Sequence, residues 1–291
     1  MDIIQKNINL APYTTYRIGG MAEYFASPAD EPDIFKILKF ARIENLPLYI
    51  LGAGSNVLVS DKGVKGVVLH LAENFANCEI EGNIVKVMAG KWLAGLINTA
   101  KKYGLSGLEP LIGIPGTVGG AIVMNAGAFN CEISKYLIEV VILDMLKEEI
   151  YNEKPINLDF GYRKSNLQKG EKIVIKGIFE LKKREINLIE EDILKFKEQR
   201  KQKQNIKFPN SGSVFRNPPD SLPAGKLLDD LNVKGMKVGN AMVSEQHANF
   251  IVNLGGAKAQ DVYLLIKQLQ NLVYEHYNIK LEPEIKFLGE F

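Results

Sequence analysis

Two glycine-rich segments constrain the fold of this chain more than any other feature. The first, GAGSN at 52–56, directly follows the apolar run PLYIL at 47–51, which we predict to be a buried strand. The second lies within GLEPLIGIPGTVGGAIVMNAGAF at 107–129, a stretch with few charges. Consecutive backbone N–H groups in turn conformations form concave anion sites, and glycine lets a ligand approach the backbone closely. Structural turns explain the glycines of one segment equally well, but the occurrence of two such segments favours anion binding.

Neither segment has the sequence of a familiar nucleotide-binding loop. Val57 stands where a GxGxxG turn needs its third glycine, and Val57-Leu58-Val59 is aliphatic rather than the start of a capped helix. Neither glycine cluster ends in the Gly-Lys-Ser/Thr of a Walker A loop. We therefore predict two phosphate-binding loops without following helices, and no Rossmann domain.

Composition and charge exclude several other classes of protein. A chain of 291 residues usually needs more than one hydrophobic core, so we expect two or three domains. The 36 basic and 34 acidic residues leave a net charge of +2, too near balance to imply a nucleic-acid partner. The N-terminal MDIIQKNINL has no long apolar region, so we expect a cytoplasmic protein with no membrane partner. Cys78, Cys131 and the three histidines show no ligand spacing, so we predict reduced thiols and no metal site.

Apolar periodicity predicts a mixed α+β protein. The expected helices are 32–44, 91–104, 188–204, 223–231 and 258–277; the expected strands are 47–51, 67–71, 136–145, 173–181 and 247–254, with a hairpin at 78–90. The charged helix at 188–204 should end near Asn205, where we place a domain boundary. Its basic residues are interpreted as a solvated helix face in preference to a phosphate site.

Seven motifs occur in an order that resembles one known family. They are YTTYRIGG (13–20), GAGSNVLVSD (52–61), IGIPGTVGGAIVMNAGAF (112–129), FGYRKS (160–165), NSGSVFRNP (210–218), VSEQHANFIVN (243–253) and LEPEIKFLG (281–289). The chain resembles the UDP-N-acetylenolpyruvoylglucosamine reductases nearly from end to end. The compact stretch between Arg163 and Ser213 resembles the shorter subclass of that family, which lacks a tyrosine-bearing insertion that closes over the substrate.

This resemblance implies an α+β fold with a two-part, non-Rossmann FAD-binding module, as in the vanillyl-alcohol-oxidase-like superfamily, plus a smaller α+β substrate domain. The first part would comprise 1–63 with 284–291, the second 64–200, and the substrate domain 207–283. FAD would lie between the two parts, near Arg17. The other implied FAD contacts are Gly52, Ala53, Gly54, Ser55, Asn56, Val57 and Leu58, and Ile114, Pro115, Gly116, Thr117, Gly119, Gly120, Ala121, Asn125 and Gly127.

The resemblance also implies an activity: NADPH-dependent, FAD-mediated reduction of UDP-N-acetyl-enolpyruvylglucosamine to UDP-N-acetylmuramate, a step of peptidoglycan precursor synthesis. Reducing an enol ether of pyruvate places negative charge in the carboxylate and requires one proton. Arg163 matches the family's arginine that faces this carboxylate, a role that suits a permanently charged, bidentate donor. Ser213 matches the proton donor. Glu284, in preference to Glu282, matches a second group that would hold the enolate if burial keeps it protonated.

Some of these residues have plainer interpretations. From residue type alone, Arg163 would be interpreted as part of a surface ion pair, and Ser213 as part of an ordinary glycine turn. The motifs in which they lie favour the functional interpretation of both residues. Asn217 is expected to position the substrate together with these two. For His247, packing or a contact with the cofactor edge is favoured over proton transfer.

Two other functions remain open. The first is another FAD-dependent oxidoreductase of the same superfamily that acts on an alcohol or lactone, against which NSGSVFRNP and LEPEI argue. The second is a nucleotide-sugar-binding protein that has lost its flavin, for which a proton donor and a carboxylate-binding arginine would have no use. We expect a monomer whose partners are the UDP-sugar and NADPH.

Overall fold

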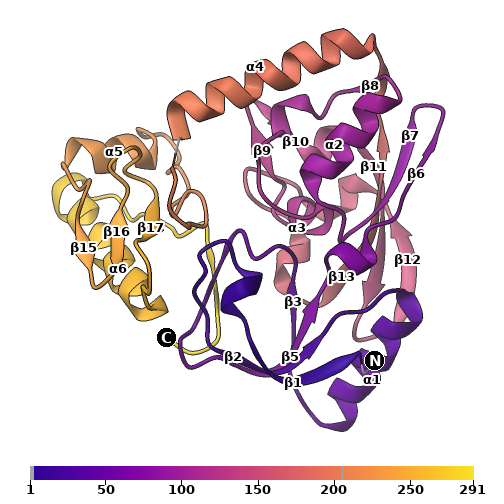
Figure 1. Ribbon diagram of the computed structural model, residues 1–291, viewed down its shortest axis with the longest axis horizontal. Coiled ribbons are helices and arrows are strands. Elements are labelled where there is room, and N and C mark those ends of the chain that lie inside the picture. The colour runs from indigo at the N-terminus through magenta and orange to yellow at the C-terminus, as the bar shows by residue number, and fades with distance from the viewer. Residues whose placement is uncertain (1–2, 205) are drawn as a thin grey trace. The chain divides into compact units, whose positions relative to one another are not determined.

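The computed structural model describes residues 3–204 and 206–291, which form two compact units (Figure 1). Of the described residues, unit 1 comprises 3–5, Phe25–Ala53 and Gly66–Arg200. Unit 2 comprises Lys6–Tyr24, Gly54–Lys65 and Lys201–Phe291. Each unit therefore combines segments that are far apart in the sequence. The predicted α+β class is confirmed.

Unit 1 is built on a five-stranded antiparallel sheet. Its order is β12 (Glu149–Glu153), β11 (Leu137–Asp144), β13 (Lys172–Glu180), β7 (Ile84–Met88) and β6 (Cys78–Glu81). The predicted strands at 136–145 and 173–181 and the hairpin at 78–90 are confirmed. Val85 and Val87 are fully buried, as expected when alternate side chains of a strand face a core.

Three helices of unit 1 follow the predicted apolar periodicity. They are α1 (Glu31–Ile43), α2 (Leu93–Lys102) and α4 (Ile186–Gln204). Asp30 caps α1 by accepting the amide of Asp33, and Pro32 occupies its first turn. Gly104, with a φ of 64°, follows the end of α2. Asn205, near which the sequence placed the end of α4, lies outside the described residues.

Helix α3 (Val118–Val123) corrects one prediction, because the second glycine loop does open a helix. Thr117 caps it by accepting the amide of Gly120 at 3.3 Å. The helix packs on β13 and β7, and Gly119 permits the close approach: a Cβ there would lie 2.8 Å from Cβ of Ala89. Six residues are too few to show helical periodicity, which is why the pattern did not reveal α3. No helix follows the first loop, as predicted; a strand, β4 (Val57–Val59), does.

Parallel strands lie on either side of the first glycine loop in the sequence. β3 (Leu48–Leu51) pairs in parallel with β5 (Val64–His70), which confirms the strands predicted at 47–51 and 67–71. They belong to a four-stranded sheet of order β1 (Ile4–Asn9), β2 (Met21–Ala26), β5 and β3. Short pairs are β9 (Gly127–Ala128) with β10 (Cys131–Glu132) and β8 (Leu105–Ser106) with β14 (Lys182–Lys183). The 3-10 helices are Ala11–Tyr13, Glu73–Phe75, Glu109–Leu111, Ile133–Tyr136, Pro155–Leu158 and Asn166–Lys169.

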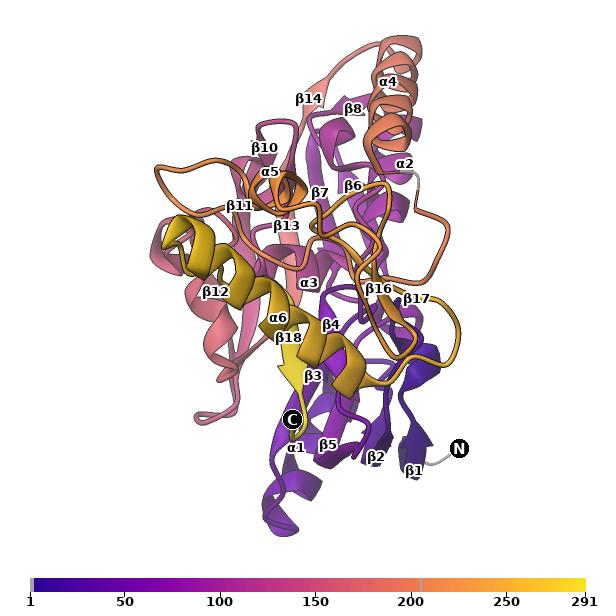
Figure 2. The ribbon, with the colours of Figure 1, turned by 90° about the vertical axis from the view of Figure 1, so that its left-hand side faces the viewer.

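Unit 2 contains a three-stranded sheet covered by a long helix. The strands are β15 (Lys237–Val238), β16 (Ala241–Val243) and β17 (Ile251–Asn253), which are labelled in Figure 1, and α6 (Ala259–Tyr277) packs on β15 and β16. Figure 2 shows α6 from the side. A shorter helix, α5 (Ala224–Asp230), precedes the sheet, and β18 (Lys286–Leu288) pairs in parallel with β4. The strand predicted at 247–254 is wrong in its first half. Residues 247–250 form a turn closed by the Phe250 amide and the His247 carbonyl at 3.1 Å, because local side-chain bonds there compete with strand pairing.

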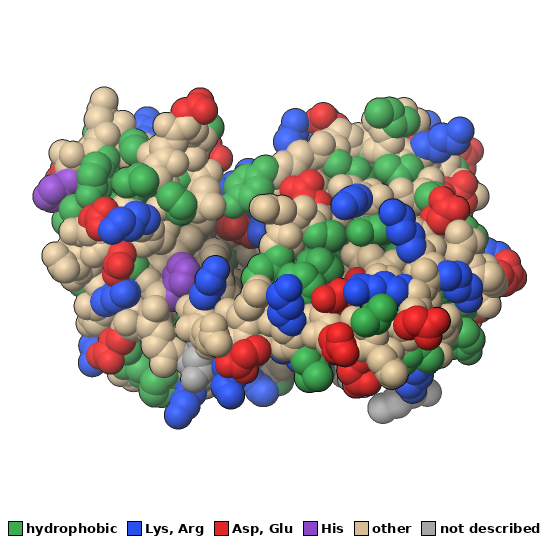
Figure 3. Space-filling view, turned by 90° about the horizontal axis from the view of Figure 1, so that it is seen from above, with side chains coloured by type: hydrophobic (Ala, Val, Ile, Leu, Met, Phe, Trp, Pro, Cys, Tyr) green, Lys and Arg blue, Asp and Glu red, His purple; other side chains and the backbone are tan. Residues whose placement is uncertain are grey.

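The surface carries charges of both signs. On the face drawn in Figure 3, Lys and Arg side chains lie interspersed with Asp and Glu side chains. Within the part of the chain that the structure describes, no helix is both long and apolar enough to cross a membrane. No cluster of three or more His, Cys, Asp or Glu residues suited to a metal ion occurs among these residues.

Candidate functional site

The first glycine loop continues in unit 2 as a turn that only glycine fits. Gly54 has a φ of 59°, and a Cβ there would overlap the carbonyl oxygen of Tyr13. Its own carbonyl accepts the amide of Thr15 at 3.2 Å. Among the described residues, the N–H groups of Gly54 and Asn56 donate to no acceptor. Two such donors in a left-handed turn have the character of an anion-binding nest.

The same loop holds two other motifs in place within unit 2. The Ser211 hydroxyl donates to the Ser55 carbonyl at 2.9 Å. The Asn56 side chain donates to the Glu284 carbonyl at 3.2 Å, and the Asn56 carbonyl accepts the Lys286 amide at 2.9 Å. The structure therefore brings the first loop against the segments that carry Ser213 and Glu284, through contacts that span 156 and 228 residues of sequence.

Ser213 and Glu284 lie on neighbouring segments. The Glu284 amide donates to the Val214 carbonyl at 2.7 Å, and the next pair along joins the Arg216 amide to the Glu282 carbonyl at 3.0 Å. Ser213 and Glu284 are both half-buried. The side chain of Glu282 is 77% exposed and lies 4.0 Å from Arg216, so it points to solvent. This difference supports the choice of Glu284 over Glu282.

The second glycine loop lies in unit 1 beside the start of the first. A Cβ on Gly52 would lie 2.5 Å from Oγ1 of Thr117, so the two loops touch at this point. The amides of Val118 and Gly119 donate to the carbonyls of Lys91 and Ala89, and the amide of Gly120 donates to the Thr117 hydroxyl. Among the described residues, the amides of Gly116 and Thr117 donate to no acceptor.

These contacts limit the backbone amides of the second loop that could bind an anion. The donors that remain are in the turn before α3, not in its first turn. Gly116, with a φ of 148°, gives that turn a backbone conformation that other residues rarely adopt.

Arg163 lies in a tight turn whose guanidinium reaches the segment after α3. Gly161 and Lys164 exchange two backbone hydrogen bonds, and Arg163 between them has a φ of 52°. A non-glycine residue in this conformation is strained, and such strain often accompanies functional sites. Its guanidinium donates to the Gly127 carbonyl at 2.7 Å and lies 5.2 Å from the Tyr162 ring. Arg163 and Gly127 are 36 residues apart, so local sequence patterns could not predict this contact.

Asn125 ties this turn to the second loop. It is fully buried, with a φ of 44°. Its side-chain amide donates to the Glu132 carboxylate and to the Gly161 carbonyl, both at 2.9 Å. One N–H donor of Asn125 thus holds the Arg163 turn through Gly161, and the other holds Glu132 of β10, so both donors serve the structure around the site.

Two further predicted residues lie at the surface of unit 2. Arg17 is exposed between the buried Tyr16 and Ile18, with a φ of 57°. The Asn217 side-chain carbonyl accepts the amide of Ala224, the first residue of α5, at 3.1 Å. The remaining predicted cofactor residues, Ala53, Ser55, Val57, Leu58, Ile114, Pro115, Ala121 and Gly127, lie in or directly after the two loops.

Helix α4 contributes a residue that the sequence interpretation missed. Ile189 and Ile193 are buried, and the Phe196 ring lies 4.9 Å from that of Phe129. Arg200 continues the same stripe, eleven residues after Ile189. Helical neighbours at such spacings share one face, so the stripe could have revealed Arg200.

Arg200 packs against the second loop. Its Nε atom is inaccessible to solvent, and a Cβ on Gly113 would lie 2.9 Å from its Cδ. Burial lowers the pKa of Arg200, and the Arg163 guanidinium lowers it further. The interpretation of this helix as a solvated basic face holds for Lys197 and Lys201, which are exposed, and is wrong for Arg200.

Comparisons with known proteins agree with this arrangement. Residues 22–147 match the family model of the FAD binding domain, and residues 204–288 match that of the UDP-N-acetylenolpyruvoylglucosamine reductase C-terminal domain. The combination defines an FAD-binding oxidoreductase with a dedicated second domain.

The full chain is similar to named members of one family. It is 43% identical to the UDP-N-acetylenolpyruvoylglucosamine reductase of Synechococcus sp. (strain JA-3-3Ab), covering 99% of this chain and 92% of that protein. It is 44% identical to the Synechocystis protein of the same name, with the same coverage. The crystal structure of the reductase (MurB) from Thermus caldophilus aligns over 98% of this chain and 100% of its own, with a TM-score of 0.85 and 36% identity. The chain belongs to the UDP-N-acetylenolpyruvoylglucosamine reductase family.

Proposed function

We propose that this protein reduces UDP-N-acetyl-enolpyruvylglucosamine to UDP-N-acetylmuramate with NADPH in the cytoplasm, as a step of peptidoglycan precursor synthesis. The observation that carries the proposal is the packing of the first glycine loop against both the Ser213 and the Glu284 segments in unit 2. This packing supports a site in which the Ser213 hydroxyl and the Glu284 carboxyl would lie near an anion-binding turn.

The residues present fit an FAD. Its diphosphate needs several backbone donors and close approach to the chain, and the turn at Gly54 in unit 2 and the turn at Gly116 in unit 1 each have the character of such a site. The donors of Gly54, Asn56, Gly116 and Thr117 would hold the phosphates. When bound, the flavin would supply hydride transfer from NADPH to the substrate.

The protein's own groups would manage charge and the proton on the substrate. Arg163 would bind the enolpyruvyl carboxylate, because a guanidinium donates two parallel hydrogen bonds to it. Negative charge that develops there would be stabilised by Arg163 together with the Glu284 carboxyl. Ser213 would donate a proton to the carbon next to the carboxylate, and Asn217 would help to orient the sugar.

The proposal includes a domain division and an oligomeric state. FAD would lie between residues 1–63 with 284–291 and residues 64–200, and the UDP-sugar would bind residues 207–283. The protein would act as a monomer.

One assay tests the proposed function. Purified protein should be yellow, with a flavin absorbance spectrum, and should oxidise NADPH only when the enolpyruvyl-UDP-sugar is added. Equal turnover with simple alcohols or lactones would instead identify an oxidase of the same superfamily. A colourless protein that binds UDP-sugars without oxidising NADPH would also contradict the proposal.

A glycine substitution tests the phosphate turn. Gly54→Ala should prevent stable flavin binding, because the new Cβ overlaps the Tyr13 carbonyl. Gly235→Ala is the matched control: its φ is 81°, but no atom of the described residues lies within 4 Å of the added Cβ. Both variants carry the left-handed strain of about 1–2 kcal/mol, so a difference between them reports the overlap. The flavin-to-protein ratio after reconstitution measures it; equal flavin content in both variants would refute the assignment.

A further inference from the structure

Asn249 holds the segment that follows Ser213 through hydrogen bonds. It is 3% exposed, and its backbone carbonyl accepts the Val214 amide at 2.9 Å. Its carboxamide accepts the Phe215 amide at 2.9 Å and donates to the Phe215 carbonyl at 2.8 Å. Three hydrogen bonds from one buried residue therefore fix the two residues next to Ser213. Buried bonds of this kind are costly to break, since each leaves an unsatisfied group.

The same hydrogen-bonded segment also contacts Glu284. The Val214 carbonyl accepts the Glu284 amide at 2.7 Å, while the Val214 amide donates to the Asn249 carbonyl. The backbone at Val214 thus lies between Asn249 and Glu284. Asn249 is thus connected through Val214 to the segments of both Ser213 and Glu284.

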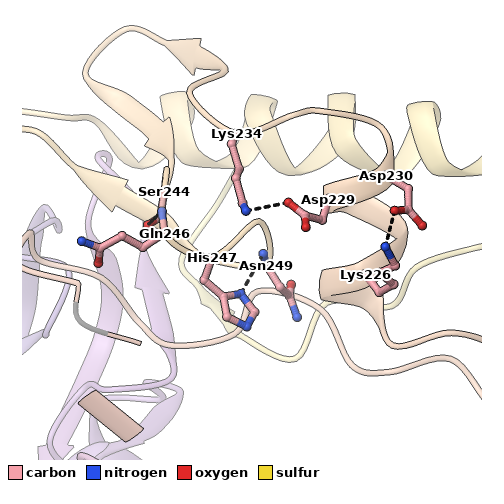
Figure 4. A network of polar contacts seen from close by, with 8 residues as sticks. All are labelled: Lys226, Asp229, Asp230, Lys234, Ser244, Gln246, His247 and Asn249. Carbon is pink, nitrogen blue, oxygen red and sulfur yellow. Dashed lines mark hydrogen bonds and ion pairs between the residues drawn. The ribbon is translucent and has the colours of Figure 1, made fainter. Parts of the chain in front are cut away.

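His247 holds Asn249 from the other side. The Asn249 amide donates to Nδ1 of His247 at 3.2 Å (Figure 4). Because a backbone N–H can only donate, Nδ1 carries no proton, and the imidazole is neutral with its proton on Nε2. The ring packs edge-on against Phe250 at 4.8 Å, and a Cβ on Gly225 would lie 3.0 Å from its Cε1. The ring has little room to move away from Asn249.

The charges around His247 preserve the neutral form. Burial lowers the pKa of His247 from its ordinary value of 6.5, Lys234 lowers it further, and Asp229 raises it. Lys234 and Asp229 form an ion pair at 2.6 Å, and Lys226 pairs with Asp230 on α5 at 2.6 Å (Figure 4). With a folded-state pKa below the unfolded one, the stabilisation from this contact is complete above the unfolded pKa. It is lost as the pH falls through the folded pKa of His247.

We propose that Asn249 is the positioning residue for Ser213 and that neutral His247 holds Asn249 in place. This inference rests on the proposed function, because it needs Ser213 to be the proton donor. A serine hydroxyl is a weak acid that can act only when it is closely aligned with the basic carbon. Neither Asn249 nor His247 touches the reacting atoms; both act through the backbone of Val214 and Phe215.

The first test is Asn249→Ala in the holoenzyme. The flavin is reduced chemically with dithionite, and its reoxidation by the enolpyruvyl-UDP-sugar is followed by stopped-flow absorbance. Misplacement of a reacting group by about 1 Å costs up to about a hundredfold, so we expect reoxidation to slow at least about tenfold while reduction by NADPH is unchanged. The solvent deuterium isotope effect on reoxidation should rise, because proton transfer becomes slower than hydride transfer.

The second test, His247→Asn, does not depend on the first variant folding. The asparagine carbonyl can accept the Asn249 amide as Nδ1 does, but it does not titrate. Reoxidation by the wild type should fall at acid pH as His247 is protonated, whereas the variant should keep its rate there. Ser244→Ala is the control: Ser244 accepts the Gln246 amide at 3.2 Å in the same loop but makes no hydrogen bond to Val214 or Phe215 among the described residues (Figure 4). It should behave as the wild type.

The outcomes separate this inference from the proposed function. Wild-type enzyme whose reduced flavin is not reoxidised by the substrate would refute the function itself. Normal wild-type reoxidation with an Asn249→Ala variant that slows both half-reactions equally, or neither, would overturn the positioning role of Asn249. An acid limb that persists in His247→Asn, or is absent from the wild type, would overturn the role of His247.

Discussion

Ser213→Ala is expected to slow reoxidation of the reduced flavin by the enolpyruvyl substrate at least about a hundredfold, the usual scale for a positioned proton donor. Reduction of the flavin by NADPH should stay nearly normal, since that step needs no proton from the substrate side. The two half-reactions are separated by stopped-flow flavin absorbance. The structure gives a reason for a local effect: the Ser213 backbone is fixed by Val214 and Gly212, whose amides donate to Asn249 and Asn210.

Ser213→Cys is the matched variant. A thiol keeps a proton to donate and adds little volume, so reoxidation should be faster than in Ser213→Ala. If both variants slow the two half-reactions to the same extent, Ser213 has a structural role and the proton comes from another group.

Arg163→Gln is expected to slow reoxidation by about a hundred- to a thousandfold, the range found when one donor to a developing negative charge is removed. The half-saturating substrate concentration should also rise, because the ground-state carboxylate loses its bidentate partner. Arg163→Lys should fall between the wild type and Arg163→Gln, since it keeps the charge but not the fork of donors. The dependence of the reoxidation rate on substrate concentration measures both effects.

Lys164 offers a control in the same turn. It is exposed and pairs with Asp159 at 2.7 Å, so Lys164→Gln should leave both half-reactions unchanged. Arg163 also donates to the Gly127 carbonyl, so the flavin content of each variant must be measured. Loss of flavin with normal reoxidation of the remaining holoenzyme would show that Arg163 supports the cofactor loop and does not bind the carboxylate.

Local patterns in the sequence predicted the elements of the fold well where burial is one-sided. α1, α2 and α6 each bury an apolar stripe, and the hairpin between β6 and β7 turns at Gly82, whose φ is 65°. The elements that the local patterns did not predict include α3, β1, β2, β15 and β16, which are short or lack alternation, whereas the resemblance alone implied the C-terminal strand that β18 forms. A six-residue helix makes too few turns for a periodic pattern, and three-residue strands such as β18 are defined by their partners.

The candidate site could be predicted only as a set of motifs. Family resemblance selected Arg163, Ser213 and Glu284, but nothing local shows that Asn56 holds Glu284, 228 residues away. Likewise, the VSEQHANF motif predicts the start of a strand. In the structure, Asn249 instead lies in a turn, and its side chain forms two hydrogen bonds with the backbone of Phe215. Such contacts depend on tertiary packing of distant segments, which a periodicity along one segment does not contain.

A crystal structure of the holoenzyme with the enolpyruvyl-UDP-sugar bound would test the central claim most directly. We predict that Arg163 contacts the substrate carboxylate, with the Glu284 carboxyl nearby. The Ser213 hydroxyl should lie within a direct or single-water hydrogen bond of the carbon that is protonated. A bound complex in which Ser213 lies farther away, or faces no pocket beside the isoalloxazine ring, would contradict it.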